Sequence, residues 1–183
     1  MTALVLFAIS LAVVGLGVFL FNRLVGLRNQ MRGAWADIDV QLTRRHDLVP
    51  QLVAAVTAYA DHERTTLEAA TELRARAVNT ASPAQLGEVE SALEAVLSRI
   101  FALREDYPDL KADSSFLQLQ RDLVEVEEHL QYARRFYNGA VRDYNTAIQR
   151  VPDLMVARAF GFREAEFFQA EEEARTPPTG LGS

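Results

Sequence analysis

The chain has 183 residues, a formal net charge of −6 and no cysteine, and its basic side chains are 18 arginines and a single lysine. The lack of cysteine excludes a disulfide framework, a thiolate zinc site and a cysteine nucleophile. The acidic balance argues against nucleic acid as a partner, because phosphate binding draws its affinity from a basic face.

The chain opens with an uncharged apolar run over residues 3–21, in which Ser10 is the only hydroxyl. As a helix this run would rise about 28 Å, close to the roughly 30 Å of a bilayer's hydrocarbon core. A cleaved signal peptide would need positive residues before the run and a small-residue cleavage site after it, and neither is present. A buried core helix would show a polar face. We therefore predict a retained transmembrane anchor over residues 1–22.

Three arginines follow the apolar run at positions 23, 28 and 32 (Arg23, Arg28 and Arg32), and no lysine or arginine precedes it. Because positive residues favour the cytoplasmic side, we expect a single-pass protein of the cell (inner) membrane with its N-terminus out and its domain in the cytoplasm. The alternatives are a signal anchor with the domain outside, or arginines that only form a solvated helix face. The same arginines are candidates for contact with anionic lipid.

Beyond the anchor, apolar residues recur at three-and-four spacing, which is typical of one helix face. The members of this stripe are Leu24, Leu27, Met31, Trp35, Ile38 and Leu42. If one helix spans 22–79, it extends roughly 85 Å, whereas its predicted partners at 83–107 and 115–149 reach only about 38 and 52 Å. Part of the stripe would then lack cover, and we interpret it as a candidate self-association surface. If the helix turns near Asp47, four helices bury the stripe internally.

Pro50 interrupts the regular pattern, because it lacks an amide hydrogen and clashes with the carbonyl four residues earlier. Either the helix continues with a kink, or it ends and Asp47 caps a new helix. No turn-forming cluster precedes Asp47, so we favour a kinked helix that continues to about Val78. The residues around the proline form a candidate anion or kink cluster, in which arginines bind an anion or the freed carbonyls: Arg44, Arg45, Asp47 and Pro50.

The later elements are delimited by clear breaks. Residues 79–83 read as a loop with Ser82 as helix cap, and the helix after it is expected to stop at Pro108. Asp113, Ser114 and Ser115 offer caps for the next helix, predicted over about 115–149, and Ser115 has capping-box form. That helix holds a heptad seam of Phe116, Leu119, Leu123, Val126, Leu130, Ala133, Tyr137, Ala140, Tyr144 and Ala147. We expect Asn138 and Asn145, which follow the seam tyrosines, to bond a neighbouring helix.

The C-terminal part is rich in phenylalanine. We interpret Phe160, Phe162, Phe167 and Phe168 as a docking segment, on the bundle itself, on a partner or on the membrane surface. Residues 176–183 have the composition of a disordered tail.

Several motifs together resemble the LemA family, single-span bacterial membrane proteins with a helical-bundle domain. They include Trp35-Ala-Asp-Ile-Asp-Val-Gln-Leu42, Arg44-Arg-His-Asp-Leu-Val-Pro-Gln-Leu52, Tyr107-Pro-Asp-Leu-Lys-Ala112 and Arg134-Arg-Phe-Tyr-Asn138. The resemblance implies a bundle of about four helices and no settled biochemical activity. The chain departs from the family pattern after Phe162, where Arg163-Glu-Ala-Glu166 replaces a usual proline.

The expected fold class is all-α: an N-terminal transmembrane helix, then an antiparallel bundle of about four helices with coiled-coil-like packing over residues 23–175. His46, His62 and His129 are far apart and lack metal-site spacing, so we expect no metal, no cofactor and no catalysis. We predict a non-enzymatic, membrane-anchored scaffold that forms homo-oligomers or docks other membrane proteins at the bilayer surface. The alternative is a monomeric accessory subunit of a membrane enzyme or transporter, acting through the phenylalanine-rich segment.

Overall fold

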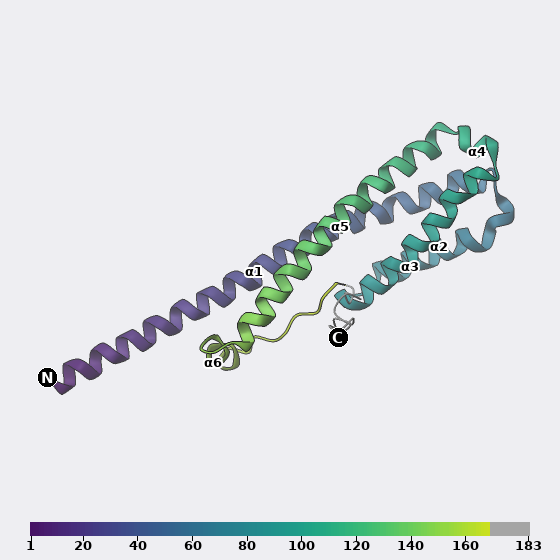
Figure 1. Cartoon of the computed structure of the whole chain (residues 1–183). Coiled ribbons are helices and arrows are strands. Elements are labelled where there is room, and N and C mark those ends of the chain that lie inside the picture. The colour runs from purple at the N-terminus through teal and green to yellow at the C-terminus, as the bar shows by residue number, and fades with distance from the viewer. Residues whose placement is uncertain (169–183) are drawn as a thin grey trace, which may run out of the picture. The chain divides into compact units, whose positions relative to one another are not determined.

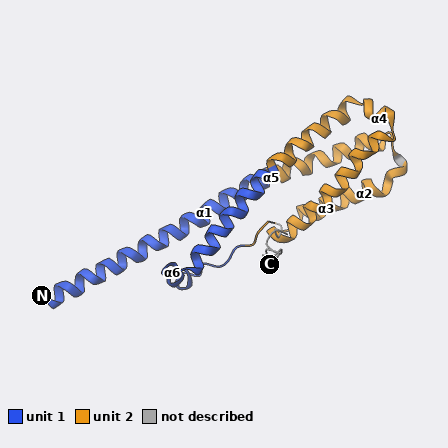
Figure 2. Ribbon diagram, in the orientation of Figure 1, with its two compact units in different colours: residues 1–40, 130–165 blue, residues 41–129, 166–183 orange. Residues whose placement is uncertain are grey.

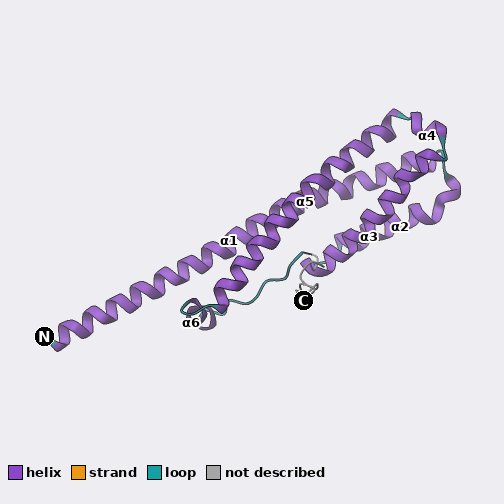
Figure 3. Ribbon diagram, viewed as in Figure 1, coloured by secondary structure: helices purple, strands orange, loops and turns teal. Residues whose placement is uncertain are grey.

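The computed structural model describes residues 1–168, and over those residues the chain is helical and contains no strand (Figure 1; Figure 3). The helices are α1 (Thr2–Thr57), α2 (Arg64–Val78), α3 (Pro83–Ala102), α4 (Pro108–Ala112), α5 (Ser114–Gln149) and α6 (Asp153–Ala159). Single 3-10 turns lie before α2 (η1, Asp61–Glu63) and after α3 (η2, Leu103–Glu105). The all-α prediction is confirmed, whereas the antiparallel four-helix bundle stays a prediction.

The chain divides into two compact units (Figure 2). Unit 1 comprises residues 1–40 and 130–165, and unit 2 comprises residues 41–129 and the chain from Glu166 onward. The region 23–175, expected as one domain, is thus shared between the two units. Its last residues and the predicted disordered tail at 176–183 lie outside the described residues.

Helix α1 continues through Pro50, as the kinked-helix interpretation expected, and the alternative of a break near Asp47 is wrong. The expectation that this helix reaches Val78 is also wrong, because α1 ends at Thr57. Ala60, at φ −133° and ψ 54°, has left the helical conformation, and its side chain is buried. The turn contains neither glycine nor proline, so packing rather than local propensity ends the helix here.

The remaining breaks match the sequence more closely. Helix α2 ends at Val78, and Ser82 caps α3 by accepting a hydrogen bond from the amide of Gln85 at 3.4 Å. Helix α3 ends at Ala102 rather than at Pro108, which instead begins the short helix α4. Proline suits this first position because the amide there needs no helical partner.

Among the three candidate caps Asp113, Ser114 and Ser115, it is Asp113 that caps helix α5. The Asp113 carboxylate accepts a hydrogen bond from the Phe116 amide at 2.8 Å and another from the Tyr59 hydroxyl at 2.9 Å. These bonds hold the pKa of the Asp113 carboxyl below its usual value, with the Phe116 amide as the larger cause. One side chain therefore joins the turn after α1 to the start of α5.

The core of unit 2 is built from one face of each long helical segment. It contains Val49, Leu52 and Val56 of α1, Leu67 and Ala70 of α2, Leu93, Leu97 and Ile100 of α3, Leu110 of α4, and Phe116 and Leu123 of α5. Beside it, the exposed corner before α4 is joined by ion pairs. Glu105 accepts from Arg104 and from Lys111, each at 3.1 Å.

The core of unit 1 gathers α1, the second half of α5, and α6. Its buried members are Leu24, Tyr144, Ala147, Ile148 and Ala157, with Leu27, Met31, Val156 and Phe162 packed against them. Apart from Leu119, which is half-buried, the residues of the predicted α5 seam are buried. The face expected from the heptad pattern is therefore the one that faces the interior.

Candidate functional site

The most buried charged groups of unit 2 form one cluster, which we call the buried charge cluster. It consists of Arg45 and His46 of α1, Glu90 of α3 and Glu127 of α5. Glu90 is fully buried and accepts from Arg45 Nη1 at 3.0 Å, with His46 Nε2 lying 2.6 Å from its other oxygen. The Arg45 side chain is 2% exposed and also pairs with Glu127. Three helices thus meet through charge-assisted bonds.

This arrangement explains how a carboxylate can be fully buried. Removing an ion from water costs several kcal/mol unless partners replace the lost hydration. The planar guanidinium of Arg45 presents several donors and so serves two carboxylates at once. Because Arg45 already faces Glu90 and Glu127, it is neutralised from within the chain.

The other members of the predicted anion or kink cluster lie elsewhere. Arg44 is exposed and pairs with Glu125 of α5 at 3.1 Å. The hydrogen bond between them raises the pKa of the Arg44 guanidinium and lowers that of the Glu125 carboxyl. Asp47 and Pro50 are exposed. The structure therefore does not bring these four residues together into one anion site.

Pro50 has a specific consequence for the carbonyl of His46. In an uninterrupted helix this oxygen would accept the amide hydrogen of residue 50, which proline lacks. Arg74 of α2 supplies a donor instead, with its Nε 3.2 Å from the His46 oxygen. The expectation that an arginine satisfies a freed carbonyl holds, but the arginine comes from the neighbouring helix rather than from position 44 or 45.

A second group of residues lies in unit 1 where α6 packs against α1, and we call it the α6 junction. Arg23 Nη1 donates to both oxygens of Asp153, at 2.7 and 2.8 Å, and the aspartate is only 4% exposed. The Phe21 ring lies 4.8 Å from that of Phe160 and 5.8 Å from that of Phe162, between centroids. The Arg28 guanidinium lies over the Phe162 ring at 5.0 Å.

The predicted lipid-contact arginines thus have different surroundings. Arg23 pairs with Asp153 and Arg28 stacks on Phe162, whereas the Arg32 side chain is exposed. Their contact with lipid stays a prediction.

The stripe predicted for self-association is packed inside the chain. Leu24, Ile38 and Leu42 are buried, and Leu27, Met31 and Trp35 are half-buried. The Trp35 ring lies 5.2 Å from that of Tyr137. The premise that this stripe lacks cover is therefore wrong: α5 and α6 supply the cover in unit 1.

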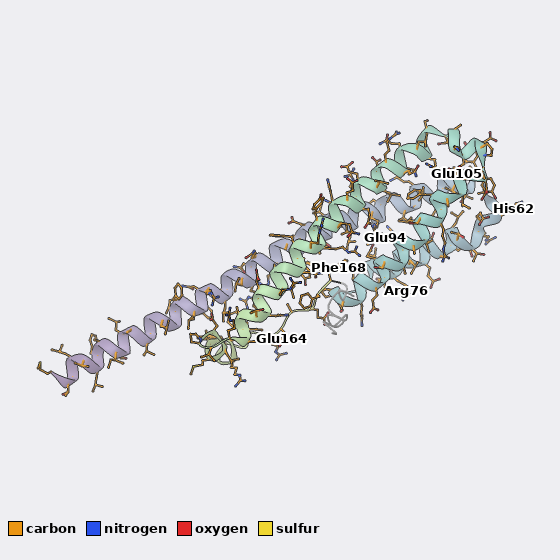
Figure 4. All side chains as sticks on the ribbon, viewed as in Figure 1. His62, Arg76, Glu94, Glu105, Glu164 and Phe168 are labelled. Atoms are coloured by element: carbon orange, nitrogen blue, oxygen red, sulfur yellow. The ribbon has the colours of Figure 1, made fainter. Side chains whose placement is uncertain are left out.

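The predicted phenylalanine docking segment contacts its own chain at several points. Tyr144 donates to the Arg163 carbonyl at 2.9 Å, and Asn145 exchanges two 2.9 Å bonds with the backbone of Ala165. Asn145 thus binds an extended segment, not the neighbouring helix we expected. Burial raises the pKa of the Tyr144 phenol. The segment after α6 also carries Glu164 and Phe168 (Figure 4), and Phe168 is fully buried.

Sequence reasoning missed Glu90 and Asp153, and a signal existed for the first. Glu90 falls at helical spacing between Leu86 and Leu93, so it sits on the apolar face of α3. Arg45 lies in the same way between Leu42 and Val49 of α1. Opposite charges on two apolar faces indicate a buried pair.

These features define a class: an all-α protein whose first helix is long and apolar enough, by length and composition, to cross a membrane. The family model that matches the sequence is that of the LemA family, over residues 34–179, and the chain belongs to this family.

Individual relatives agree with this assignment. Protein LemA of Metamycoplasma hominis is 26% identical over 179 residues, covering 92% of this chain and 80% of the relative. Magnetosome protein MamQ 2 of Paramagnetospirillum magneticum is 33% identical over 81 residues, covering 44% of this chain and 30% of the relative. A MamQ protein of Magnetospirillum gryphiswaldense is 28% identical over 81 residues, again 30% of its length. The match thus spans less than a third of the MamQ proteins.

Proposed function

We propose that this protein is a non-enzymatic scaffold, held in the cell membrane by one helix, that docks other membrane proteins at the bilayer surface. The observation that carries the proposal is the exposure of the apolar segment 3–19 of α1. In this segment Leu4, Phe7 and Phe19 are 74%, 70% and 64% exposed. Apolar surface of this extent on an uncharged helix of membrane-spanning length is stable in lipid rather than in water.

The orientation proposed is that with the arginines in the cytoplasm. Arg23, Arg28 and Arg32 all follow within 15–20 residues of the apolar segment, the distance over which positive charge sets topology. The pairing of Arg23 with Asp153 changes this little, because acidic residues contribute weakly to the bias.

A scaffold is favoured over an enzyme because the buried charged groups serve the fold. Glu90, Arg45 and His46 bond one another across helices. Since the Leu24–Leu42 stripe is used within the chain, we propose docking of partners rather than self-association along this stripe.

The anchor is tested with a matched pair of charge insertions, Leu11→Arg at the centre of the apolar segment and Val78→Arg at the exposed end of α2. Arginine at the centre of a spanning helix costs about 2.5–3.5 kcal/mol in insertion. We expect Leu11→Arg to lower the fraction of protein retained in membranes after alkaline carbonate extraction, and Val78→Arg to leave it unchanged. Full release of the unmodified protein by carbonate would overturn the anchor.

The docking role is tested by light scattering of the full-length protein in mild detergent, together with cross-linking in native membranes. We expect the purified chain to have a mass near 20.4 kDa after correction for detergent, and cross-links in membranes to other membrane proteins. A discrete oligomer whose cross-links join only copies of this chain would contradict partner docking.

A further inference from the structure

Helix α6 lies directly against the apolar segment of α1. The two elements line an open groove of about 320 Å³, formed by Val14, Gly17, Val18 and Phe21 of α1 with Val156 and Phe160 of the α6 region. Val14 precedes Phe21 by seven residues, which is about 10 Å along a helix. The α6 region therefore lies beside the C-terminal part of the apolar run 3–21 rather than starting after it.

The α6 region also carries exposed apolar side chains. Val151 and Met155 are 75% and 70% exposed, and Phe160, which touches Phe21 of α1, is still 65% exposed. Exposed arginines flank and interrupt them at positions 150, 158 and 163. The acidic residue between them, Asp153, is buried and neutralised by Arg23.

We infer that residues 150–163 insert into the interfacial layer of the same bilayer that the apolar segment crosses, with Val151, Met155 and Phe160 in contact with lipid. This inference rests on the proposed membrane anchor. If hydrocarbon surrounds α1 as far as Phe21, then Val156 and Phe160, which line the same groove as Val14 and Phe21, lie at the edge of the hydrocarbon. The exposed apolar surface of α1 thus continues onto α6, so lipid that surrounds α1 also contacts α6.

Charge favours lipid over a protein partner as the occupant of this face. Long arginine side chains can bury their stems along apolar surface and place the guanidinium among lipid phosphates. Arg150, Arg158 and Arg163 have this placement around the exposed apolar residues. A basic rim around an apolar face is typical of segments that lie in the membrane interface and prefer anionic lipid.

The test uses the absence of cysteine from the chain. Single-cysteine variants of the full-length protein, each carrying an environment-sensitive fluorophore, are reconstituted into phosphatidylcholine–phosphatidylglycerol vesicles. Met155→Cys probes α6 and Phe7→Cys probes the anchor. The matched control is Phe136→Cys, an exposed apolar position of α5 that lies about 20 Å along the helix from Gln149. Each label is exposed to a lipid nitroxide near the top of the acyl chain and, separately, to iodide in water.

We expect the nitroxide to quench the labels at positions 7 and 155, and iodide to quench only the label at position 136. One outcome would overturn the inference and leave the anchor intact. In it, iodide but not the nitroxide quenches the label at position 155, while the nitroxide still quenches the label at position 7. Failure of the nitroxide at both positions would overturn the anchor as well. A label at position 155 that neither quencher reaches would mean protein cover, such as a second copy, and would also overturn lipid contact.

Discussion

At the scale of single residues, the feature with the clearest energetic consequence is the proline inside α1. The His46 carbonyl loses its helical donor at Pro50 and gains one from Arg74 of the next helix. A proline that would destabilise an isolated helix is therefore also a point at which α2 is attached to α1.

We predict that Arg74→Leu lowers the free energy of unfolding by about 1–3 kcal/mol, because it leaves a carbonyl without a partner. In a Pro50→Ala background the alanine amide supplies the missing hydrogen, so the same substitution is expected to cost less. Chemical denaturation in mild detergent measures the free energy of unfolding of four proteins: the unmodified chain, Arg74→Leu, Pro50→Ala and the double variant. The cost of Arg74→Leu is then compared between the two backgrounds. Arg76→Leu, at an exposed position of the same helix (Figure 4), is the matched control. Equal cost in both backgrounds would contradict the role assigned to Arg74.

The buried charge cluster leads to a second prediction. Glu90→Ala is expected to destabilise the protein by about 3–5 kcal/mol, because it leaves Arg45 in the interior without one of its carboxylates. Glu94→Ala, one turn further along α3 (Figure 4), is the control and should have little effect. The double variant Arg45→Met with Glu90→Leu is expected to recover much of the loss. If it is less stable than either single variant, charge pairing is not what the cluster contributes.

Part of this cluster could be predicted from the sequence and part could not. Arg45 and Glu90 each interrupt an apolar stripe at helical spacing, which marks them as buried charges. Their pairing with each other depends on which helices are neighbours, and periodicity does not contain this information. Arg74 carries no local signal, because its partner is a backbone oxygen 28 residues away.

At the scale of elements, the start of α5 and the turn after α1 depend on the same carboxylate. Asp113→Ala removes the bonds to the Phe116 amide and the Tyr59 hydroxyl, so we predict a lower unfolding temperature. Ser115→Ala, at the candidate cap with capping-box form, should leave the temperature nearly unchanged. Circular dichroism during heating measures both. An equal effect of the two substitutions would show that the first turn of α5 does not depend on this cap.

The pH dependence of the Asp113 contribution has a defined sign. The folded-state pKa of Asp113 is lower than the ordinary aspartate value of 3.8. Its stabilising effect is therefore present above that value and is lost as the pH falls through the folded pKa. The fall in unfolding temperature below about pH 4 should accordingly be smaller in Asp113→Ala than in the unmodified protein.

Helix boundaries were predictable where the backbone itself enforces them. Ser82 and Pro83 begin α3 as their chemistry requires, and Asp113 was one of several caps available to α5. The end of α1 at Thr57 was not predictable, because alanine-rich sequence favours a continued helix. Burial of Ala60 and the bond from Tyr59 to Asp113 fix this turn, and both involve residues far away in the chain.

At the scale of the whole molecule, α1 and α5 each pass through both units. Trp35, the only tryptophan, lies in unit 1 beside Tyr137 and so reports on that unit. Because two helices are shared, we predict that denaturation followed by tryptophan fluorescence coincides with denaturation followed by circular dichroism.

The matched control moves the reporter to the other unit. Trp35→Phe with Phe101→Trp places the tryptophan next to Phe116 in unit 2, where Phe101 now lies with ring centroids 6.2 Å apart. We expect the same midpoint from this variant. Two separate midpoints would mean that the units unfold independently despite the shared helices.

The single domain expected over residues 23–175 stays a prediction, and helix α5 contributes to both compact units within it. Its heptad seam is regular from Phe116 to Ala147, which favours a single bundle. In the structure this face is buried, but different residues pack against its two halves. Phe116 and Leu123 belong to the core of unit 2, whereas Tyr144 and Ala147 belong to that of unit 1. A periodic pattern defines which face is buried and not what buries it.

The single lysine of the chain, Lys111 in α4, offers a specific site for chemical labelling. Lys111 is the only lysine in the chain, its side chain is 58% exposed, and its amine contacts only the exposed carboxylate of Glu105 among the bonds described above. Arginine does not react with activated esters, so side-chain acylation by such reagents is confined to one atom of unit 2. Dyes, biotin or a solid support coupled through amines would therefore attach at Lys111 or at the α-amine of Met1, and amine cross-linkers bound at Lys111 would report on the surroundings of α4.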